Sequence, residues 1–337
     1  MIKVAINGFG RIGRLAFREM ITGTTFDVVA INDLTDAETL AYLLKYDTNH
    51  RTFHENEISA DGDNLVIAGS KKIKVYAESD PVNLPWGELG VDVVFECSGH
   101  FTDVEKAKKH IEAGAKHVII SAPAKGNCKT VVYGVNESVL DGNEEIISAA
   151  SCTTNCLAPV LKVLDDNYKI IKGFMTTVHA YTNDQATLDV PNKKGINSRR
   201  GRACAQNIVP TSTGAALAIG EVIPSLKGRL DGLAIRVPVS DGSMIDCTLE
   251  LGKVTSINDI NQLLTNAQSD TLKVTSDPVV SSDVIDKRCG SLVDLLSTNV
   301  VEIDGKQLVK VIAWYDNEMG YTTQMMRTAE YFVNLKK

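Results

Sequence analysis

The chain opens with Ile2-Lys3-Val4-Ala5-Ile6-Asn7-Gly8-Phe9-Gly10-Arg11-Ile12-Gly13, which predicts a strand, a glycine-rich turn and the start of a helix. Apolar residues alternate up to Ile6, and apolar residues at helical spacing follow the glycines. Gly8 permits the tight turn, Gly10 lets the backbone approach a pyrophosphate, and Gly13 lets the helix pack closely on the strand. The stretch therefore predicts an α/β fold of the Rossmann type, a doubly wound parallel sheet with a dinucleotide at the helix N-terminus.

An acidic residue at the end of the next strand indicates which dinucleotide. The predicted strand 26–31 ends just before Asp33, at the spacing of about 20 residues beyond the glycines that is typical of this unit. A carboxylate there accepts hydrogen bonds from the ribose hydroxyls of an adenosine, and it repels a 2′-phosphate. The sequence therefore predicts NAD rather than NADP as the cofactor.

The alternation of strands and helices continues through the first 121 residues. Strands are predicted over 91–96 and 116–120, with a helix over 104–113 between them. Ligands of a doubly wound sheet bind at the carboxyl ends of its strands. Ser98, Gly99 and Ser121 follow two of these ends, so we expect them in the cofactor crevice.

Composition favours about two domains and an acidic surface. The 337 residues are 44% hydrophobic and 23% charged, with a net charge of -7 and a pI near 5.5. This balance argues against nucleic acid or an anionic membrane as the main partner. Seven cysteines without a recognisable signal peptide predict a reducing, cytoplasmic location.

Two histidines form the one spacing that suggests a metal. His50 and His54 lie four residues apart, as two ligands on one helix face would. No third ligand follows at a suitable spacing, so the sequence favours surface histidines and no metal site.

A second decisive stretch is Ser151-Cys152-Thr153-Thr154-Asn155-Cys156, which predicts a helix N-terminus because apolar residues at helical spacing follow it. Unpaired N–H groups and the helix dipole favour a thiolate there, so we expect the pKa of Cys152 to lie below its usual value of about 8.5. A buried structural cysteine is the alternative, since free cysteines are among the most buried residues.

The pattern changes beyond Cys152. Strands 231–237 and 243–251 follow one another without a helix between them, which is typical of an antiparallel sheet. Further elements are expected as strands over 169–179 and 307–314 and as helices over 213–223, 257–267 and 320–335. The sequence predicts two domains: an NAD-binding domain, 1–151, with the C-terminal helix 318–337 packing back on it, and a catalytic α+β domain, 152–317, with a mainly antiparallel sheet.

A polar loop over 183–206 carries a basic cluster. So long a loop is usually functional, and we expect this one to cover the cofactor or to contact another subunit; an ordinary solvated loop is the alternative. Its basic residues are Lys193, Lys194, Arg199, Arg200 and Arg202.

Six motifs occur along the chain in an order that is specific to one family. They are Ile6-Asn7-Gly8-Phe9-Gly10-Arg11-Ile12-Gly13-Arg14, Ala150-Ser151-Cys152-Thr153-Thr154-Asn155-Cys156, His179-Ala180-Tyr181-Thr182, Pro210-Thr211-Ser212-Thr213-Gly214-Ala215-Ala216, Arg236-Val237-Pro238 and Trp314-Tyr315-Asp316-Asn317-Glu318-Met319-Gly320-Tyr321. In these motifs the sequence resembles the phosphorylating glyceraldehyde-3-phosphate dehydrogenases over essentially its whole length.

The resemblance implies a role for particular residues. Cys152 is the implied nucleophile, and His179 is its base and hydrogen-bond donor. The residues implied to hold NAD are Arg11, Ile12, Asp33, Ser121 and Asn317, with Asn317 on the nicotinamide amide. The residues implied to hold phosphate groups are Ser151, Thr153, Thr182, Thr213, Gly214 and Arg236.

The implied reaction is the NAD-dependent oxidation of glyceraldehyde 3-phosphate in glycolysis. It passes through a cysteine thioester that inorganic phosphate cleaves, giving 1,3-bisphosphoglycerate. The family is usually a homotetramer, so the resemblance also implies that assembly.

Two alternatives stay open at this point. An erythrose-4-phosphate dehydrogenase would share almost every motif, and an additional non-enzymatic binding or adhesion role would leave no mark in the sequence. Two positions also depart from the family pattern: Ser79 stands where an arginine commonly precedes Asp-Pro, and Leu217 replaces a common lysine.

Overall fold

The computed structural model describes residues 1–192 and 195–335, which form two compact units. The first unit comprises residues 1–131, 137–150 and 325–337, and the second comprises 132–136 and 151–324. The C-terminal helix α8 (Met319–Asn334) is therefore divided between them. Lys193 and Lys194 of the predicted basic cluster lie outside the described residues.

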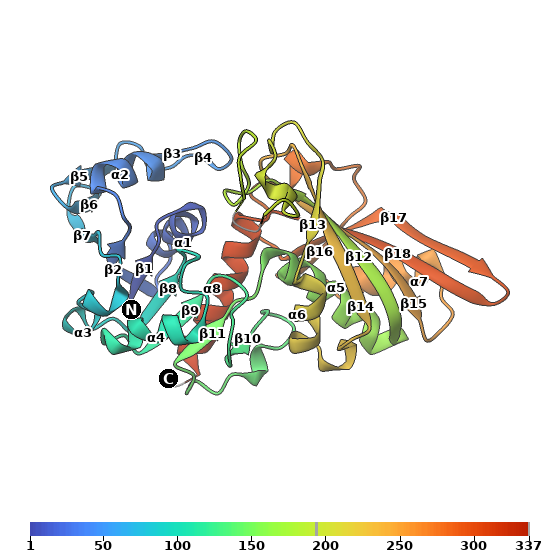
Figure 1. Cartoon of the computed structure of the whole chain (residues 1–337). Helices are drawn as coiled ribbons and strands as arrows, with labels where there is room; N and C mark the ends of the chain where they lie inside the picture. Colours follow the sequence, from blue (N-terminus) through green and yellow to red (C-terminus); the bar gives the residue numbers. More distant parts are fainter. Residues whose placement is uncertain (193–194, 336–337) are drawn as a thin grey trace. The chain divides into compact units, whose positions relative to one another are not determined.

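A nine-stranded sheet forms the centre of the first unit as far as the chain is described (Figure 1). Its strands are parallel except at one edge, where β7, β6 and β5 pair antiparallel. In sheet order the strands are β10 (Lys129–Thr130), β11 (Ile146–Ser148), β9 (His117–Ile120), β8 (Val93–Glu96), β1 (Ile2–Asn7), β2 (Phe26–Asn32), β7 (Lys71–Tyr76), β6 (Asn64–Ile67) and β5 (Ile58–Asp61).

The helices of this unit begin where the sequence supplies caps or glycines. Asp36 accepts the N–H of Thr39 at the start of α2, and Asp103 accepts that of Glu105 at the start of α4. The short elements of the unit are the β3–β4 pair (Tyr46–Asp47 and Arg51–Thr52), η1 (Pro81–Asn83) and η2 (Glu137–Val139). Its helices are α1 (Arg11–Thr22), α2 (Ala37–Lys45), α3 (Trp86–Leu89) and α4 (Val104–Glu112).

The order of the strands reverses at β1, which lies between β2 and β8. Ligands of open α/β sheets bind at such a switch point, outside the carboxyl ends of the strands. Here those ends carry buried polar side chains, Asn7 on β1, Asn32 on β2 and Glu96 on β8. The sheet therefore gathers polar groups where the sequence predicts the cofactor.

His50 is not at the surface, contrary to the sequence-based expectation. Its side chain is buried, and its backbone N–H donates to Asp47 Oδ1 in the same turn. His54 is exposed as expected and pairs with Glu57. The spacing in the sequence does not show that the two histidines differ in burial, because the difference arises from the turn at Asp47, which directs His50 inward.

The second unit contains a seven-stranded, mainly antiparallel sheet among its described residues. Two pairs are parallel, β12 with β14 and β16 with β17. The first arises because the chain leaves β12 and passes through α6 before it forms β14. In sheet order the strands are β13 (Val209–Ser212), β14 (Leu230–Val237), β12 (Ile170–Ala180), β15 (Ser243–Leu251), β18 (Lys306–Tyr315), β17 (Ser291–Ile303) and β16 (Leu272–Thr275).

Capping side chains also position the helices of the second unit. Ser151 accepts the N–H of Thr154 and so fixes the start of α5, while Ser256 and Asp259 form a capping box at the start of α7. The remaining elements are α5 (Cys152–Tyr168), α6 (Ala215–Val222), α7 (Ile257–Asn266), η3 (Arg199–Gly201), η4 (Pro224–Leu226) and η5 (Ser281–Val284). In the described residues no helix has both the length and the apolar character needed to cross a membrane.

Candidate active site

Four of the predicted cofactor residues line one cavity in the first unit, with a volume of about 500 Å³. They are Gly8, Gly10, Asp33 and Ser98. Other residues also line this cavity without having been predicted from the sequence. Two of them, Asn7 and Asn32, carry a recognisable signal, because each is a polar residue at the end of an apolar strand.

The glycines of the turn are needed for close packing. Gly8 has a φ of +89°, and a Cβ there would lie 2.5 Å from Cα of Ser98. A Cβ on Gly13 would lie 2.1 Å from the carbonyl oxygen of Gly8. Around the Cβ position of Gly10, by contrast, there is no described atom within 4 Å, so the backbone is open to a ligand on that side.

The remaining predicted residues of the first unit surround this turn. Asp33 Oδ2 accepts the N–H of Phe9 at 2.7 Å, which ties the acid to the turn. Ile12 packs on the core, and the side chain of Arg11 pairs with Asp47. Both residues can therefore offer a ligand their backbone at the start of α1, and not their side chains. Gly99 follows Ser98 with a φ of +74°.

Ser121 lies next to β8. Its N–H donates to the carbonyl oxygen of Glu96 at 3.0 Å, directly after the end of β9. The predicted residues of the first unit thus follow four neighbouring strands, β2, β1, β8 and β9, as the doubly wound pattern requires.

These residues fit a dinucleotide. Helix α1 begins after Gly10, which cannot cap it with a side chain, and its first turn contains no acidic residue. This is the construction of helix N-termini that bind phosphate groups. An open glycine, an uncapped helix start and a carboxylate at Asp33 together match the pyrophosphate and the ribose of NAD.

In the second unit, Cys152 and His179 come together. Cys152 is the first residue of α5, and His179 lies near the end of β12. The Sγ atom of Cys152 is 3.4 Å from Nε2 of His179. The residue before the helix cap, Ala150, has a φ of +59°, a strained value for a residue with a side chain, and strain of this kind is common at active sites.

The hydrogen bonds of His179 fix its tautomer. Its Nδ1 lies 2.7 Å from the carbonyl oxygen of Ala180, which can only accept, so Nδ1 carries the proton. Burial, together with the positive charge of Arg236, lowers the pKa of His179 to about 3. The ring is therefore neutral near pH 7, and its unprotonated Nε2 faces the thiol.

The expected low pKa of Cys152 is not found in this structure. Burial raises the pKa of its thiol, while the charge of Arg236 and hydrogen bonds with Thr153 act in the opposite direction. The pattern around a helix N-terminus is visible in sequence, but the degree of burial is not. Because the thiol is protonated and its neighbour is a neutral imidazole, nucleophilic attack requires proton transfer to His179.

Arg236 joins this pair through the sheet. Strands β12 and β14 run in a register that pairs Arg236 with His179. Its Nη1 donates to the carbonyl oxygen of Ala180 at 2.9 Å and to Thr182 Oγ1 at 2.8 Å. Burial and the nearby charge of Arg200 lower the pKa of Arg236. An anion beside these two guanidinium groups would relieve the repulsion that Arg236 experiences.

Arg200, which the sequence placed only in a basic loop, is connected to Arg236. Its guanidinium pairs with Asp184 and donates from Nε to Thr211 Oγ1 at 3.2 Å. Asp184 also accepts the hydroxyl of Thr182, so one hydrogen-bonded chain connects Arg200 with Arg236. An acid five residues after His179 beside a basic cluster is a weak signal, and the sequence alone did not reveal this link.

Thr213 and Gly214 form the start of α6. Thr213 Oγ1 accepts the N–H of Ala215, and Gly214 is the N-cap residue without a capping side chain. Gly214 also lines a cavity of about 710 Å³ that Arg200 and Thr211 share. A helix start and an arginine therefore face one cavity.

Ser151 and Thr153 flank the cysteine but differ in their partners. Ser151 caps α5, whereas Thr153 Oγ1 lies 3.0 Å from the hydroxyl of Tyr315, which also contacts Thr177 at 2.8 Å. Tyr315 is buried, and its ring meets that of His179 edge-on at 5.8 Å. Tyr315 thus supports both Thr153 and His179, a role that its position in the sequence did not indicate.

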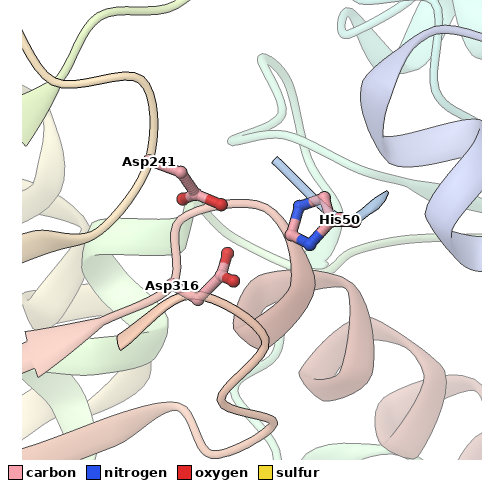
Figure 2. Close-up of side chains that lie close together, drawn as sticks. All are labelled: His50, Asp241 and Asp316. Atoms are coloured by element: carbon pink, nitrogen blue, oxygen red, sulfur yellow. The ribbon is translucent and has the colours of Figure 1, made fainter. Parts of the chain in front are cut away.

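Asn317 is held in the turn that precedes α8. Its Oδ1 accepts the hydroxyl of Ser243 at 2.6 Å. The carboxylate of the preceding residue, Asp316, accepts the N–H groups of Glu318 and Met319 and so fixes this turn. Figure 2 shows Asp316 with Asp241, whose carboxylate oxygens lie within 4.8 Å of each other; His50, also drawn there, belongs to the first unit.

Comparison with known proteins covers both units. Residues 2–104 match the family model "Glyceraldehyde 3-phosphate dehydrogenase, NAD binding domain", and residues 151–317 match "Glyceraldehyde 3-phosphate dehydrogenase, C-terminal domain". The chain belongs to the glyceraldehyde-3-phosphate dehydrogenase family. This membership confirms the resemblance, the fold class and NAD as the cofactor that the sequence predicted.

Curated members of the glyceraldehyde-3-phosphate dehydrogenase family match over their full length. The chain is 55% identical to "Glyceraldehyde-3-phosphate dehydrogenase" of Clostridium pasteurianum over 337 residues, which is 100% of both chains. It is 52% identical to the protein of that name from Streptococcus pyogenes over 338 residues, again 100% of both.

Proposed function

We propose that this chain is an NAD-dependent oxidoreductase that converts glyceraldehyde 3-phosphate and inorganic phosphate into 1,3-bisphosphoglycerate, as a step of glycolysis. The observation that carries the proposal is the contact of 3.4 Å between Cys152 Sγ and Nε2 of a neutral His179, beside the buried charge of Arg236. A nucleophile, its base and an anion site are what a thioester route from a phosphorylated aldehyde needs.

In this mechanism His179 first acts as a base. It takes the thiol proton at Nε2 while Cys152 Sγ attacks the aldehyde carbon and forms a C–S bond. The developing oxyanion is stabilised by N–H groups at the start of α5 and by the protonated imidazole, which then returns the proton to give a hemithioacetal.

The oxidation leaves a thioester on Cys152. Bound NAD supplies the acceptor for the hydride that leaves the hemithioacetal carbon. His179 takes the hydroxyl proton as the carbonyl re-forms. Inorganic phosphate then attacks the thioester carbonyl, the C–S bond breaks, and the thiolate of Cys152 regains a proton.

The two phosphate groups need separate partners. Arg236 and Thr182, already joined to each other, are proposed to hold the phosphate of the aldehyde. Inorganic phosphate is assigned to the helix starts, with Ser151 and Thr153 on α5 and Thr213 and Gly214 on α6. Both assignments use N–H, hydroxyl and guanidinium donors, which match a dianion.

For the cofactor, each predicted residue is assigned to one part of NAD. Gly8, Gly10, Arg11, Ile12 and Gly13 would hold the pyrophosphate at the start of α1. The ribose is assigned to Asp33, and the remaining contacts to Ser98, Gly99 and Ser121. Asn317 is assigned to the nicotinamide amide.

For the domain organisation, we propose an NAD-binding domain over 1–151 with 318–337 and a catalytic domain over 152–317.

The proposed reaction is tested by NADH formation from glyceraldehyde 3-phosphate with and without inorganic phosphate. With phosphate, turnover should rise to saturation and yield an acyl phosphate. Without it, at most one NADH per active site should appear before the rate falls sharply. Steady NADH production at full rate in phosphate-free buffer, with a free acid as product, would contradict the proposal. A higher kcat/KM for erythrose 4-phosphate would favour that aldehyde as the substrate.

We also propose a cytoplasmic homotetramer that binds neither nucleic acid nor membrane. The net charge of -7 supports the last two points. A subunit contact is supported by three exposed apolar side chains that the strand register puts on one face of the second sheet: Phe174, Val301 and Leu308. Sedimentation of the wild type and of a Phe174→Glu variant tests the assembly.

A further inference from the structure

A buried carboxylate lies directly behind the cofactor cavity. Glu96 ends β8, and its side chain has no solvent exposure. Burying a charge costs free energy unless the charge is hydrogen-bonded. The four donors around Glu96 are Asn7 Nδ2, His110 Nε2, the N–H of Ser98 and the hydroxyl of Ser98.

Trp86 and His110 determine which groups donate and which accept in this network. Trp86 Nε1, which can only donate, lies 3.0 Å from His110 Nδ1. His110 Nδ1 is therefore the acceptor, its proton is on Nε2, and that proton points to Glu96 Oε2 at 3.1 Å. All three side chains are buried: Trp86 donates, His110 accepts at Nδ1 and donates at Nε2, and Glu96 accepts.

The near side of the network consists of residues that line the cavity. Asn7 donates to Glu96 at 2.5 Å, so its Oδ1 is left to accept from Asn32 Nδ2 at 2.7 Å. Asn32 in turn accepts the N–H of Glu78 at 2.9 Å. The orientation of both amides therefore follows from the carboxylate of Glu96.

Glu96 also joins two turns of the chain. Asn7 precedes Gly8, and Ser98 opens the turn after β8. These turns pack so closely that a Cβ on Gly8 would lie 2.5 Å from backbone atoms of Ser98. One carboxylate thus holds the glycine-rich turn and the Ser98 turn in a single arrangement.

We propose that Glu96 is a positioning residue for NAD: through Asn7 and Ser98 it sets the shape of the cofactor cavity, and Trp86 and His110 hold it in place. The inference rests on the proposed function because it takes NAD as the ligand. Glu96 itself touches neither substrate nor cofactor in this proposal. Its effect is on affinity for NAD and not on the chemistry at Cys152.

The test is Glu96→Gln, with Val93→Ala as the matched control. Glutamine has nearly the shape of glutamate, but its amide nitrogen cannot accept from the surrounding donors. Val93 is buried in the same strand on the opposite face, so its truncation weakens packing without touching the network. Both variants should lower the Tm.

The readouts separate positioning from stability. In Glu96→Gln, the Kd for NAD by calorimetry and the KM for NAD should rise about tenfold or more, the change expected when a charge-assisted hydrogen bond is lost. The kcat at saturating NAD and the alkylation rate of Cys152 without NAD should stay within about twofold. Val93→Ala should keep the wild-type Kd.

An unchanged Kd in Glu96→Gln beside an active wild type would overturn this inference alone. A wild-type chain that binds no NAD would overturn the proposed function as well. If Glu96→Gln does not fold, Trp86→Phe tests the same network from its far end by removing the N–H that orients His110. A rise of about threefold in the Kd for NAD then supports the inference, and an unchanged Kd overturns it.

Discussion

Cys152 and His179, 27 residues apart in the chain, meet through Sγ and Nε2 at 3.4 Å. The hydrogen bond from His179 Nδ1 to Ala180 leaves Nε2 as an acceptor, so the thiol donates to the imidazole. Since burial raises the pKa of Cys152 and lowers that of His179, the pair rests as thiol and neutral imidazole. Reactivity of the thiol then depends on the imidazole as a base.

The first prediction concerns the order in which the seven cysteines are alkylated. Iodoacetamide near neutral pH should label Cys152 far faster than the others, because it combines partial exposure with a base at hydrogen-bond distance. Cys156, one turn further along α5, is buried, and burial raises the pKa of its thiol well above the usual range. Peptide mapping gives the order, and uniform labelling or earlier labelling of Cys156 would count against the assignment.

Removal of the base extends this test. His179→Asn should slow alkylation of Cys152 and lower kcat about a hundredfold or more, the usual range for loss of a general base. As a control, His117→Asn changes a histidine that bonds to a backbone carbonyl in the first unit and should leave both rates unchanged. Equal alkylation rates in wild type and His179→Asn would show that the imidazole does not activate the thiol.

The second prediction concerns the choice of cofactor. Asp33→Ala should weaken NAD binding about tenfold to a hundredfold, because it removes charge-assisted hydrogen bonds to the ribose. It should also reduce the difference in binding affinity between NAD and NADP, because the carboxylate no longer repels the 2′-phosphate. Asp36→Ala is the matched control, since it removes a carboxylate that caps α2 and does not line the cavity. If wild type used NADP as well as NAD, Asp33 would not be the discriminating residue.

The third prediction concerns stability against pH. Burial alone would raise the pKa of Asp47, but the hydrogen bonds from Arg11 and the backbone of His50, with their charges, lower it to about 2. The folded-state pKa lies below the value of 3.8 for an unperturbed aspartate. The ionised carboxylate therefore stabilises the folded protein above pH 3.8, and this contribution is lost as the pH falls through about 2.

The size of the expected loss in stability follows from the pKa shift of Asp47. Asp47→Asn should lose about 2 kcal/mol of stability near pH 7, with Asp47 almost fully buried. The difference from wild type in urea denaturation should be constant from neutral pH to about pH 5 and should shrink below pH 4. Asp61→Asn, which breaks an exposed pair with Lys72, should change stability little throughout. A pH-independent loss in Asp47→Asn would mean that packing, not the charge, accounts for it.

Local patterns explain what the sequence could predict. The glycine turn, Asp33 at the end of a strand and Cys152 at a helix start depend on residues close together in the chain, so periodicity and spacing suffice to place them. Strand β17 does not show in the sequence pattern, because Asp294, Ser297 and Asn299 interrupt its apolar alternation.

Long-range contacts explain the rest. Tyr315 reaches Thr153 across 162 positions, and Arg236 meets His179 only through the register of two parallel strands. The hydrogen bonds of Glu96 and His110 join residues of β1, β8, α3 and α4 for the same reason. The direction of the pKa shift of Cys152 could not be predicted either, because it depends on burial, which is a property of the packed chain and not of the helix start alone.

The last prediction concerns Arg236 and the phosphate of the aldehyde. Arg236→Ala should lower kcat/KM for glyceraldehyde 3-phosphate about a hundredfold, because a guanidinium bond to a phosphate dianion is lost from a buried site. With unphosphorylated glyceraldehyde, the loss should be much smaller, since this contact is remote from the carbonyl. The ratio of kcat/KM for the two aldehydes is therefore the quantity to measure.

Arg202→Ala is the control for charge alone. Arg202 belongs to the basic loop 183–206 and not to β14; it is exposed and pairs with Asp189, so its removal should leave the ratio unchanged. Arg236→Lys keeps the charge without the fork of donors to Ala180 and Thr182, and it should fall between wild type and Arg236→Ala. An equal loss on both aldehydes in Arg236→Ala would place its effect on Cys152 and His179, whose pKa values its charge lowers, and not on substrate phosphate.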